Sequence, residues 1–186
     1  MPKSICVFCA SSNNINEIYI ENARQVGETI AKRGDTLIYG GGSVGLMGVV
    51  ARAVHAHGGK VVGVIPEVLN KVEVAYELSD ELVVTRDMRE RKAIMDDRSD
   101  AVITLPGGFG TLEELIEMIT HKQLLYHDKP IVLMNINGFY NPLAELFDHF
   151  FRENFARDQY RGIYHLADTV ADAFEYIDAY PVNSRK

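Results

Sequence analysis

The sequence has no surplus of basic charge and no long apolar run. Its 186 residues carry 19 Lys and Arg against 26 Asp and Glu, a formal net charge of -7. Because nonspecific nucleic-acid binding depends on many Lys and Arg contacts to phosphates, this balance argues against a nucleic-acid partner. No stretch of 18 consecutive apolar residues is present, and the first residues lack the charged and apolar segments of a signal peptide. We therefore expect a cytoplasmic protein with no membrane partner.

Cysteine is scarce, because Cys6 and Cys9 are the only two. Their C-x-x-C spacing is that of a redox motif, but such a motif needs its first cysteine at a helix N-terminus, where the thiolate is stabilised. Here both cysteines lie in an apolar run, residues 5–10, that predicts a strand. Residues three apart on a strand lie on opposite faces. We interpret both as buried strand cysteines.

The six histidines are not spaced as metal ligands. His55 and His57 are two residues apart, so on a helix they face different directions. The other four are His121, His127, His149 and His165. No metal and no other cofactor is expected.

Short apolar runs alternate with longer helical patterns along the chain. The strand candidates are 4–10, 36–40, 60–65, 81–85, 101–105 and 130–134. The helix candidates are 14–33, 45–58, 87–99, 111–126, 141–154 and 169–180. This alternation predicts an α/β fold, a doubly wound parallel sheet with helices on both faces. No repeat or linker interrupts it, so residues 1–186 are expected to form a single domain, with ligands bound beyond the carboxyl ends of the strands.

The first glycine loop, GGGSVGLMG at residues 40–48, follows a strand and opens a helix. Gly40, Gly42 and Gly45 form a G-x-G-x-x-G pattern, with the acidic Glu67 about 20 residues on, as in dinucleotide-binding proteins. Against that interpretation, the fingerprint normally follows the first strand. The alternative is that the glycines let the helix pack close to the sheet. We expect both tight packing and backbone amides that face a ligand.

The second glycine loop, PGGFGT at residues 106–111, predicts an anion site. Its glycines permit backbone angles that expose successive N–H groups, and the following helix adds its positive end. Thr111 can add a hydroxyl donor. A second interpretation stays open, because Thr111 and Glu114 also match a capping box in which the glutamate only caps the helix.

Three arginines crowd the start of the helix that follows the strand at 81–85. Cations near a helix N-terminus oppose its dipole, yet Arg86, Arg89 and Arg91 lie there beside the ordinary capping residue Asp87. They are either a solvated, salt-bridged turn or a cluster that binds phosphate or ribose.

The arginine turn and Glu114 belong to helices that follow consecutive strands, and a right-handed crossover is expected to bring the two helix starts together. A cation, a carboxylate and an anion site in one cleft suit cleavage at a sugar carbon. A carboxylate stabilises the oxocarbenium-like transition state and can activate the attacking water.

The loop at 40–48, the turn MRERK at 88–92 and the signature PGGFGTLEE at 106–114 resemble the Lonely Guy (LOG) family, cytokinin riboside 5'-monophosphate phosphoribohydrolases often mislabelled as lysine decarboxylases. The resemblance covers nearly the whole chain. It implies a Rossmann-like nucleotide-binding domain, a homodimer, and hydrolysis of the N-glycosidic bond of a nucleoside 5'-monophosphate such as AMP. The products would be a free base and ribose 5-phosphate.

The resemblance also assigns residues. It makes Arg91 and Glu114 catalytic. It also implies substrate-binding residues, two of which, Gly42 and Ser43, lie in the first glycine loop. The others are Glu73, Met88, Lys92, Gly107, Gly108, Phe109, Gly110, Thr111, Leu112 and Glu113. One departure concerns specificity: many relatives have His where this chain has Arg89, and the segment 70–77 is less typical.

Two other functions compete with this hydrolase. A non-catalytic nucleotide or molybdenum-cofactor carrier uses similar glycine turns but has no need of the pair Arg91 and Glu114. A lysine decarboxylase needs a lysine that forms a Schiff base with pyridoxal phosphate, and no lysine in the sequence stands out for that purpose.

Overall fold

A parallel sheet of seven strands forms the centre of the computed structural model, which describes residues 1–72 and 75–181. Each hydrogen-bonded pair of neighbouring strands is parallel. Across the sheet the order is β4 (Glu81–Thr85), β3 (Lys60–Pro66), β2 (Thr36–Tyr39), β1 (Ser4–Phe8), β5 (Ala101–Thr104), β6 (Ile131–Met134) and β7 (His165–Ala167).

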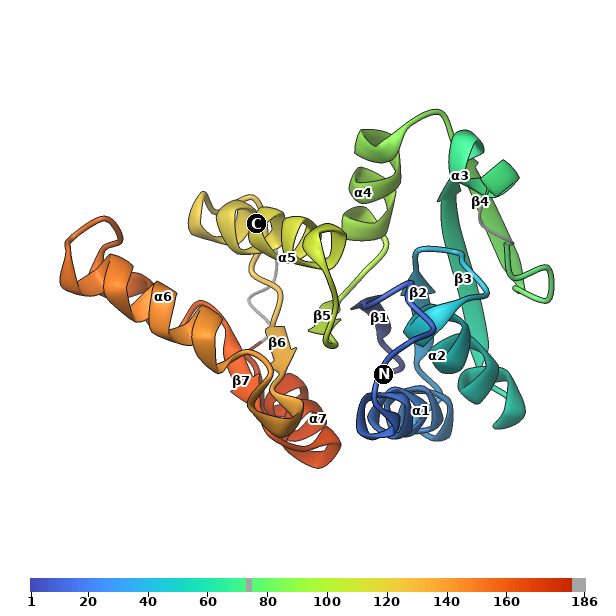
Figure 1. Ribbon diagram of the computed structural model, residues 1–186, viewed down its shortest axis with the longest axis horizontal. Coiled ribbons are helices and arrows are strands. Elements are labelled where there is room, and N and C mark those ends of the chain that lie inside the picture. The colour runs from blue at the N-terminus through green and yellow to red at the C-terminus, as the bar shows by residue number, and fades with distance from the viewer. Residues whose placement is uncertain (73–74, 182–186) are drawn as a thin grey trace.

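Helices cover both faces of this sheet, as Figure 1 shows. One face carries α1 (Glu17–Lys32), α2 (Gly45–Ala56) and α7 (Val170–Ala179), and the other carries α4 (Met88–Asp97) and α5 (Phe109–Gln123). The remaining helices are α3 (Glu67–Val72), α6 (Asn141–Arg152) and two short 3-10 helices, η1 (Ile136–Gly138) and η2 (Asp158–Tyr160). The predicted doubly wound, Rossmann-like α/β fold is confirmed.

Alternation along β1 decides where the cysteines lie. Cys6 packs into the core under α4 and α5, whereas Cys9, just past the end of the strand, packs into the core under α1 and α2. Both thiols are buried and unbridged, and burial raises the pKa of each above its usual range. The interpretation of the C-x-x-C spacing as two buried residues is therefore confirmed.

The chain reverses its direction of travel across the sheet between β1 and β5. Strands β2 to β4 are added on one side of β1, and β5 to β7 on the other. Such a switch point opens a crevice at the carboxyl ends of the strands. The loops after β1 and β5 meet there, because the Ala10 amide donates to the Pro106 carbonyl at 3.2 Å.

Most predicted elements lie within a few residues of the observed ones, but two were missed. These are the helix α3, with six residues, and the strand β7, with three; the 3-10 helices η1 and η2, also with three residues each, were not predicted either. Elements this short have too few residues for a period to show. The predicted strand 4–10 also ends early, at Phe8, because the chain then bends into the loop that meets Pro106.

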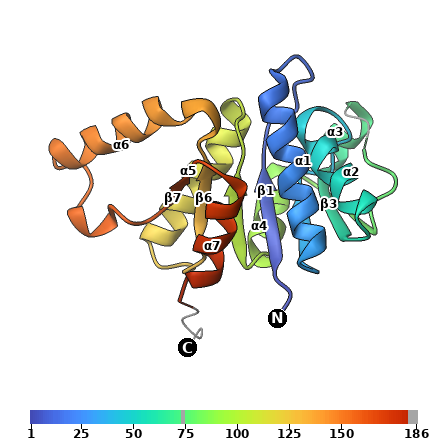
Figure 2. The same cartoon turned by 90° about the horizontal axis from the view of Figure 1, so that it is seen from below.

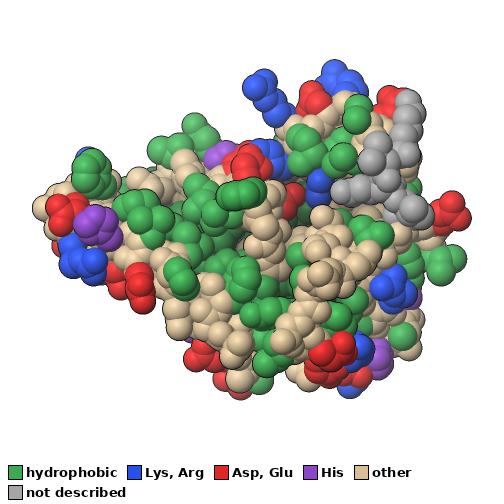
Figure 3. All heavy atoms as spheres, in the orientation of Figure 1, with side chains coloured by type: hydrophobic (Ala, Val, Ile, Leu, Met, Phe, Trp, Pro, Cys, Tyr) green, Lys and Arg blue, Asp and Glu red, His purple; other side chains and the backbone are tan. Residues whose placement is uncertain are grey.

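An apolar surface surrounds α6, which projects from the body of the molecule (Figures 1 and 2). Only Phe147 of this helix is buried. Figure 3 shows hydrophobic side chains gathered over α5, α6 and the hollow between them. The exposed large hydrophobic residues of these helices and the turns after them include Ile116, Leu124, Leu125, Leu146, Phe150 and Phe155. Despite this surface, no helix in residues 1–72 and 75–181 is long and apolar enough to cross a membrane.

Candidate active site

Arg91 and Glu114 form a buried ion pair between α4 and α5. The distance from Arg91 Nη2 to Glu114 Oε1 is 3.2 Å, and the two side chains are 10% and 8% exposed. Within the described residues, Nε of Arg91 has no hydrogen-bond partner. Since buried polar groups normally have partners, this N–H is a donor suited to a ligand. The structure thus brings together the two side chains that the sequence singled out.

The helices that carry Arg91 and Glu114 follow strands that are consecutive along the chain. In the sheet β4 and β5 are not neighbours, because β3, β2 and β1 lie between them. The connection therefore passes over three strands, and the expected meeting of the two helix starts is confirmed by the contact between Arg91 and Glu114. Both α4 and α5 cover the same face of the sheet, where Met95 of α4 and Leu115 of α5 share one core. Their shared apolar face holds Arg91 against Glu114.

The capping-box interpretation of Glu114 is also wrong. The helix α5 begins at Phe109 with Gly108 as its N-cap residue, so Thr111 lies inside the first turn. Gly108 has no side chain to cap the helix, and its carbonyl already accepts the Leu112 amide at 3.0 Å. The Glu114 carboxylate therefore does not cap α5 and forms an ion pair with Arg91.

Burial sets the protonation of Glu114. Removal from water raises the pKa of its carboxyl from 4.5 to about 7, and the opposing effect of Arg91 is smaller. A carboxyl with a pKa near neutrality exchanges its proton readily, as a general base or acid must. The site therefore holds one group whose charge changes around pH 7, beside a guanidinium that stays charged.

Gly40, at the end of β2, leaves the space that Arg91 occupies. A Cβ atom at this position would lie 2.1 Å from Nη2 of Arg91 and 3.1 Å from Sδ of Met47. Only glycine allows the guanidinium to lie here without displacement. This glycine therefore supports the ion pair.

The rest of the first glycine loop packs against the loop after β1. Gly45 has φ of +57°, and a Cβ there would lie 2.6 Å from the Ala10 carbonyl oxygen. The Gly45 amide donates to Oδ1 of Asn13 at 2.8 Å. Gly42 pairs with Ala75 in an isolated bridge, and the Ser43 carbonyl accepts from Arg52 at 3.0 Å. The packing function expected of this loop is confirmed.

The second glycine loop has a packed side and an open side. A Cβ on Gly107 would lie 2.2 Å from Oγ1 of Thr111, which is itself buried. Gly108 and Gly110 have open space around them. The start of α5 thus presents an uncrowded backbone and the positive end of a 15-residue helix.

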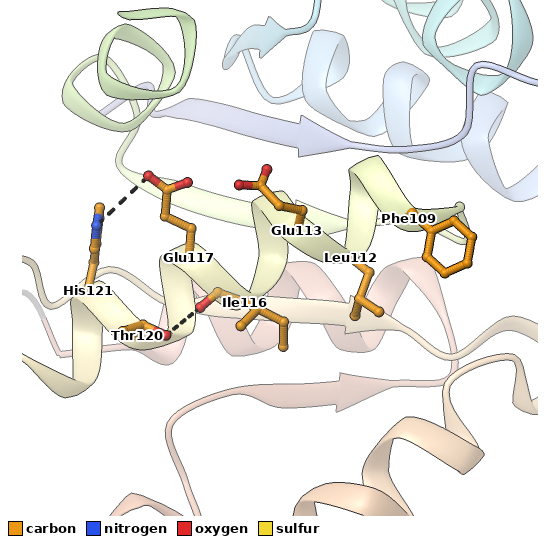
Figure 4. A pocket seen from close by; sticks show the side chains of 7 residues that line it. All are labelled: Phe109, Leu112, Glu113, Ile116, Glu117, Thr120 and His121. Atoms are coloured by element: carbon orange, nitrogen blue, oxygen red, sulfur yellow. Dashed lines mark hydrogen bonds and ion pairs between the residues drawn. The ribbon is translucent and has the colours of Figure 1, made fainter. Parts of the chain in front are cut away.

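The other expected binding residues are spread around α5 and the start of α4. Phe109 is 93% exposed, and Leu112 lies with it beside a shallow groove of about 510 Å³ along α5 (Figure 4). Met88 lies at the start of α4, with its sulfur 3.6 Å from Nη1 of Arg91. Lys92 pairs with Glu113 at 2.5 Å. Glu73 lies outside the described residues.

The three arginines at the start of α4 differ in exposure and in the residues that they contact. Asp87 caps α4 by accepting from the Arg89 and Glu90 amides. Arg86 is exposed and pairs with Glu90, so for this residue the solvated interpretation holds. Arg89 is exposed but lines a cavity of about 150 Å³ between α4 and α5, which Glu114 lines too. Only Arg91 is buried.

The sequence analysis missed Glu117 and His121, which line the same cavity. They follow Glu114 by three and seven residues on α5. That spacing is the signal that would have found them, since such residues share one face of a helix.

Comparisons with known proteins show which proteins this chain is similar to. The family model described as "Possible lysine decarboxylase" matches residues 47–177. A rice (Oryza sativa subsp. japonica) protein named probable cytokinin riboside 5'-monophosphate phosphoribohydrolase LOGL2 is 45% identical over 99% of this chain and 75% of its own. The Arabidopsis thaliana protein named cytokinin riboside 5'-monophosphate phosphoribohydrolase LOG5 is 43% identical over 97% of this chain and 80% of its own.

Solved structures share the fold at lower identity. The molybdenum cofactor carrier protein from Chlamydomonas reinhardtii superposes with a TM-score of 0.72 at 22% identity, covering 96% of this chain and 97% of that one. The molybdenum cofactor binding protein from Rippkaea orientalis has a TM-score of 0.71 at 24% identity, with coverages of 96% and 97%. These two show the fold alone. The sequence relatives show more: the chain belongs to the Lonely Guy (LOG) family.

Proposed function

We propose that this protein hydrolyses the N-glycosidic bond of a nucleoside 5'-monophosphate, AMP or its N6-prenylated (cytokinin riboside) form, and releases the free base and ribose 5-phosphate. The observation that carries the proposal is the buried pair of Arg91 and Glu114, whose carboxyl has its pKa raised to about 7. The names of the relatives, which are phosphoribohydrolases, support the same reaction.

The 5'-phosphate is assigned to the start of α5. The amides of the second glycine loop and the positive end of the helix attract an anion. Gly108 and Gly110 leave room for it to approach, and Thr111 offers a hydroxyl. This position places the ribose between the loop and the carboxylate of Glu114, which is five residues into the helix from Phe109.

Glu114 and Arg91 then act on the reacting atoms. As the bond between the ribose carbon and the base nitrogen breaks, its electron pair leaves with the base. The Glu114 carboxylate stabilises the positive charge that develops on the sugar and takes a proton from the attacking water, whose oxygen bonds to the ribose carbon. The base takes up one proton and Glu114 gives up the proton that it took from water, so that one water molecule is consumed and the carboxylate is regenerated. Arg91 orients the carboxylate and offers its remaining donors to the substrate.

Turnover of AMP is the direct test. Purified protein given AMP should release adenine and ribose 5-phosphate, detected by chromatography, without added metal or cofactor. A parallel series with prenylated AMP, GMP and CMP measures base preference, for which Arg89 is a candidate residue because it lines the same cavity as Glu114. If neither AMP nor its prenylated form yields a free base, the hydrolase is excluded. Tight binding of AMP without turnover would favour the carrier instead.

We propose further that two copies associate through the apolar surface around α6, with residues 1–186 of each acting as one nucleotide-binding domain in the cytoplasm. Exposed apolar patches of this kind mark interfaces, and Leu146, Phe150 and Phe155 are 46%, 39% and 87% exposed. Light scattering should give twice the mass of the chain, and Phe150→Glu should halve it. A monomeric wild type would contradict the dimer.

A further inference from the structure

A row of ion pairs lies directly beside Arg91 and Glu114. Lys92 follows Arg91 on α4, and its Nζ lies 2.5 Å from Oε1 of Glu113 and also contacts Glu117 on α5. The Lys92 side chain is only 16% exposed. Two consecutive residues of α4 therefore hold carboxylates of α5, one of them Glu114 itself.

The row continues away from the site along the contact between α4 and α5. His121 lies 3.9 Å from Glu117 and 3.6 Å from Asp96 of α4. Asp96 in turn contacts the ammonium group of the buried Lys129, just before β6. Figure 4 shows Glu113, Glu117 and His121 along α5, with the contact between Glu117 and His121 dashed. The row is thus anchored in the core at its far end.

A cavity of about 150 Å³ joins this row to Glu114. Its lining includes Glu114 together with Lys92, Asp96, Glu117 and His121. The charged groups that act on Glu114 are Arg91 and Lys92 from α4, which lower its pKa, and Glu113 and Glu117 from α5, which raise it. The buried thiols of Cys6 in β1 and of Cys9 just after it lie near enough to Glu114 for its charge to raise their pKa values further.

We propose, building on the phosphoribohydrolase function proposed above, that Lys92 and Glu117 are positioning residues, which fix α4 against α5 and set both the geometry and the charge of the Arg91–Glu114 pair. Lys92 acts through the carboxylates that hold it, in addition to the substrate contact that the family resemblance implies for it. Glu117 acts from one helical turn beyond Glu114, held in place by Lys92 and His121. The two residues have opposite electrostatic effects on the same carboxyl.

Lys92 and Glu117 shift the pKa of Glu114 in opposite directions, and this difference provides a test of the proposal. In this mechanism Glu114 must be ionised to act as base, so kcat falls as the pH drops through its pKa. Lys92→Met removes a positive charge and should move this acid limb to higher pH, whereas Glu117→Gln removes a negative charge and should move it to lower pH. Both variants should lower the plateau kcat by about tenfold, because loosened geometry slows the reaction, with KM changed less. Lys92→Arg keeps the positive charge, so the acid limb of its kcat profile should lie at the wild-type pH.

Two controls remove surface ion pairs from the other face of the sheet. Lys32→Met and Glu21→Gln break pairs on α1 with Glu28 and Arg24, and their pH profiles should match the wild type. The proposal would be overturned if the acid limb of the kcat profile stayed at the same pH in Lys92→Met and Glu117→Gln, or moved in the same direction in both. So would a rise in KM alone for Lys92→Met, which would indicate a substrate contact and no positioning function.

A readout that needs no turnover separates this proposal from the proposed function. Carbon-13 NMR titration of the Glu114 carboxyl should show the same opposite displacements in the two variants. If the wild type releases no base but the titrations diverge as described, the hydrolase function fails while the electrostatic coupling stands. If the wild type is active and the titrations coincide, the positioning proposal fails and the function stands.

Discussion

Glu114→Gln should lower kcat by about a thousandfold, within the range typical of a lost general base or acid. Glutamine keeps the shape and the hydrogen-bonding reach of the carboxyl, but it can neither accept a proton from water nor carry the negative charge that stabilises the sugar cation. Because Glu114 does not cap α5, the helix should form as before. The measurement is release of adenine from AMP at saturating substrate, with circular dichroism to verify folding.

The matched control is Glu175→Gln on α7, an exposed carboxylate on the opposite face of the sheet. It should retain wild-type turnover. A Glu114→Gln enzyme that works at more than a tenth of the wild-type rate would show that the carboxylate is not the base and would move attention to the glycine loop alone.

The sequence predicts the order of strands and helices along the chain well, because a parallel strand that is buried on both faces has a continuous run of apolar residues. The run at residues 60–65 became β3 with its predicted start and one extra residue. Three-residue β7 could not be found in this way, because its pairing with β6 depends on partners far along the chain. Strand order was also beyond reach, and with it the path that brings Arg91 to Glu114.

The residues of the site could be found from sequence, but their functions could not be separated. Thr111 and Glu114 have the spacing of a capping box, and nothing local distinguishes a cap from a base. The decision depends on where α5 begins, which is Phe109, three residues before the capping box requires. Likewise, the sequence predicts Lys92 only as a substrate-binding residue, and its contacts with the carboxylates of Glu113 and Glu117 depend on the packing of α4 against α5.

Glu114 should also make the folded protein less stable as the pH rises, and Glu114→Gln should remove that loss. The pKa of this carboxyl is raised from 4.5 to about 7 on folding. Below pH 4.5 both the folded and the unfolded states hold the proton, so the group contributes nothing. Between pH 4.5 and 7 the unfolded state releases its proton first, which favours unfolding. Above pH 7 the whole penalty applies.

The penalty amounts to about 3 kcal/mol, since each pKa unit corresponds to about 1.4 kcal/mol. The free energy of unfolding of Glu114→Gln, relative to wild type, should therefore grow by about 3 kcal/mol between pH 4.5 and pH 8 in urea titrations. Glu175→Gln, which removes an exposed carboxyl on the other face of the sheet, is measured beside it as the control. A flat difference for Glu114→Gln would mean that the carboxyl titrates in the folded protein as it does in water. Burial would then not raise the pKa of Glu114 toward neutrality. A difference that grows with pH would show that the buried Glu114 carboxylate lowers the free energy of unfolding of the wild type.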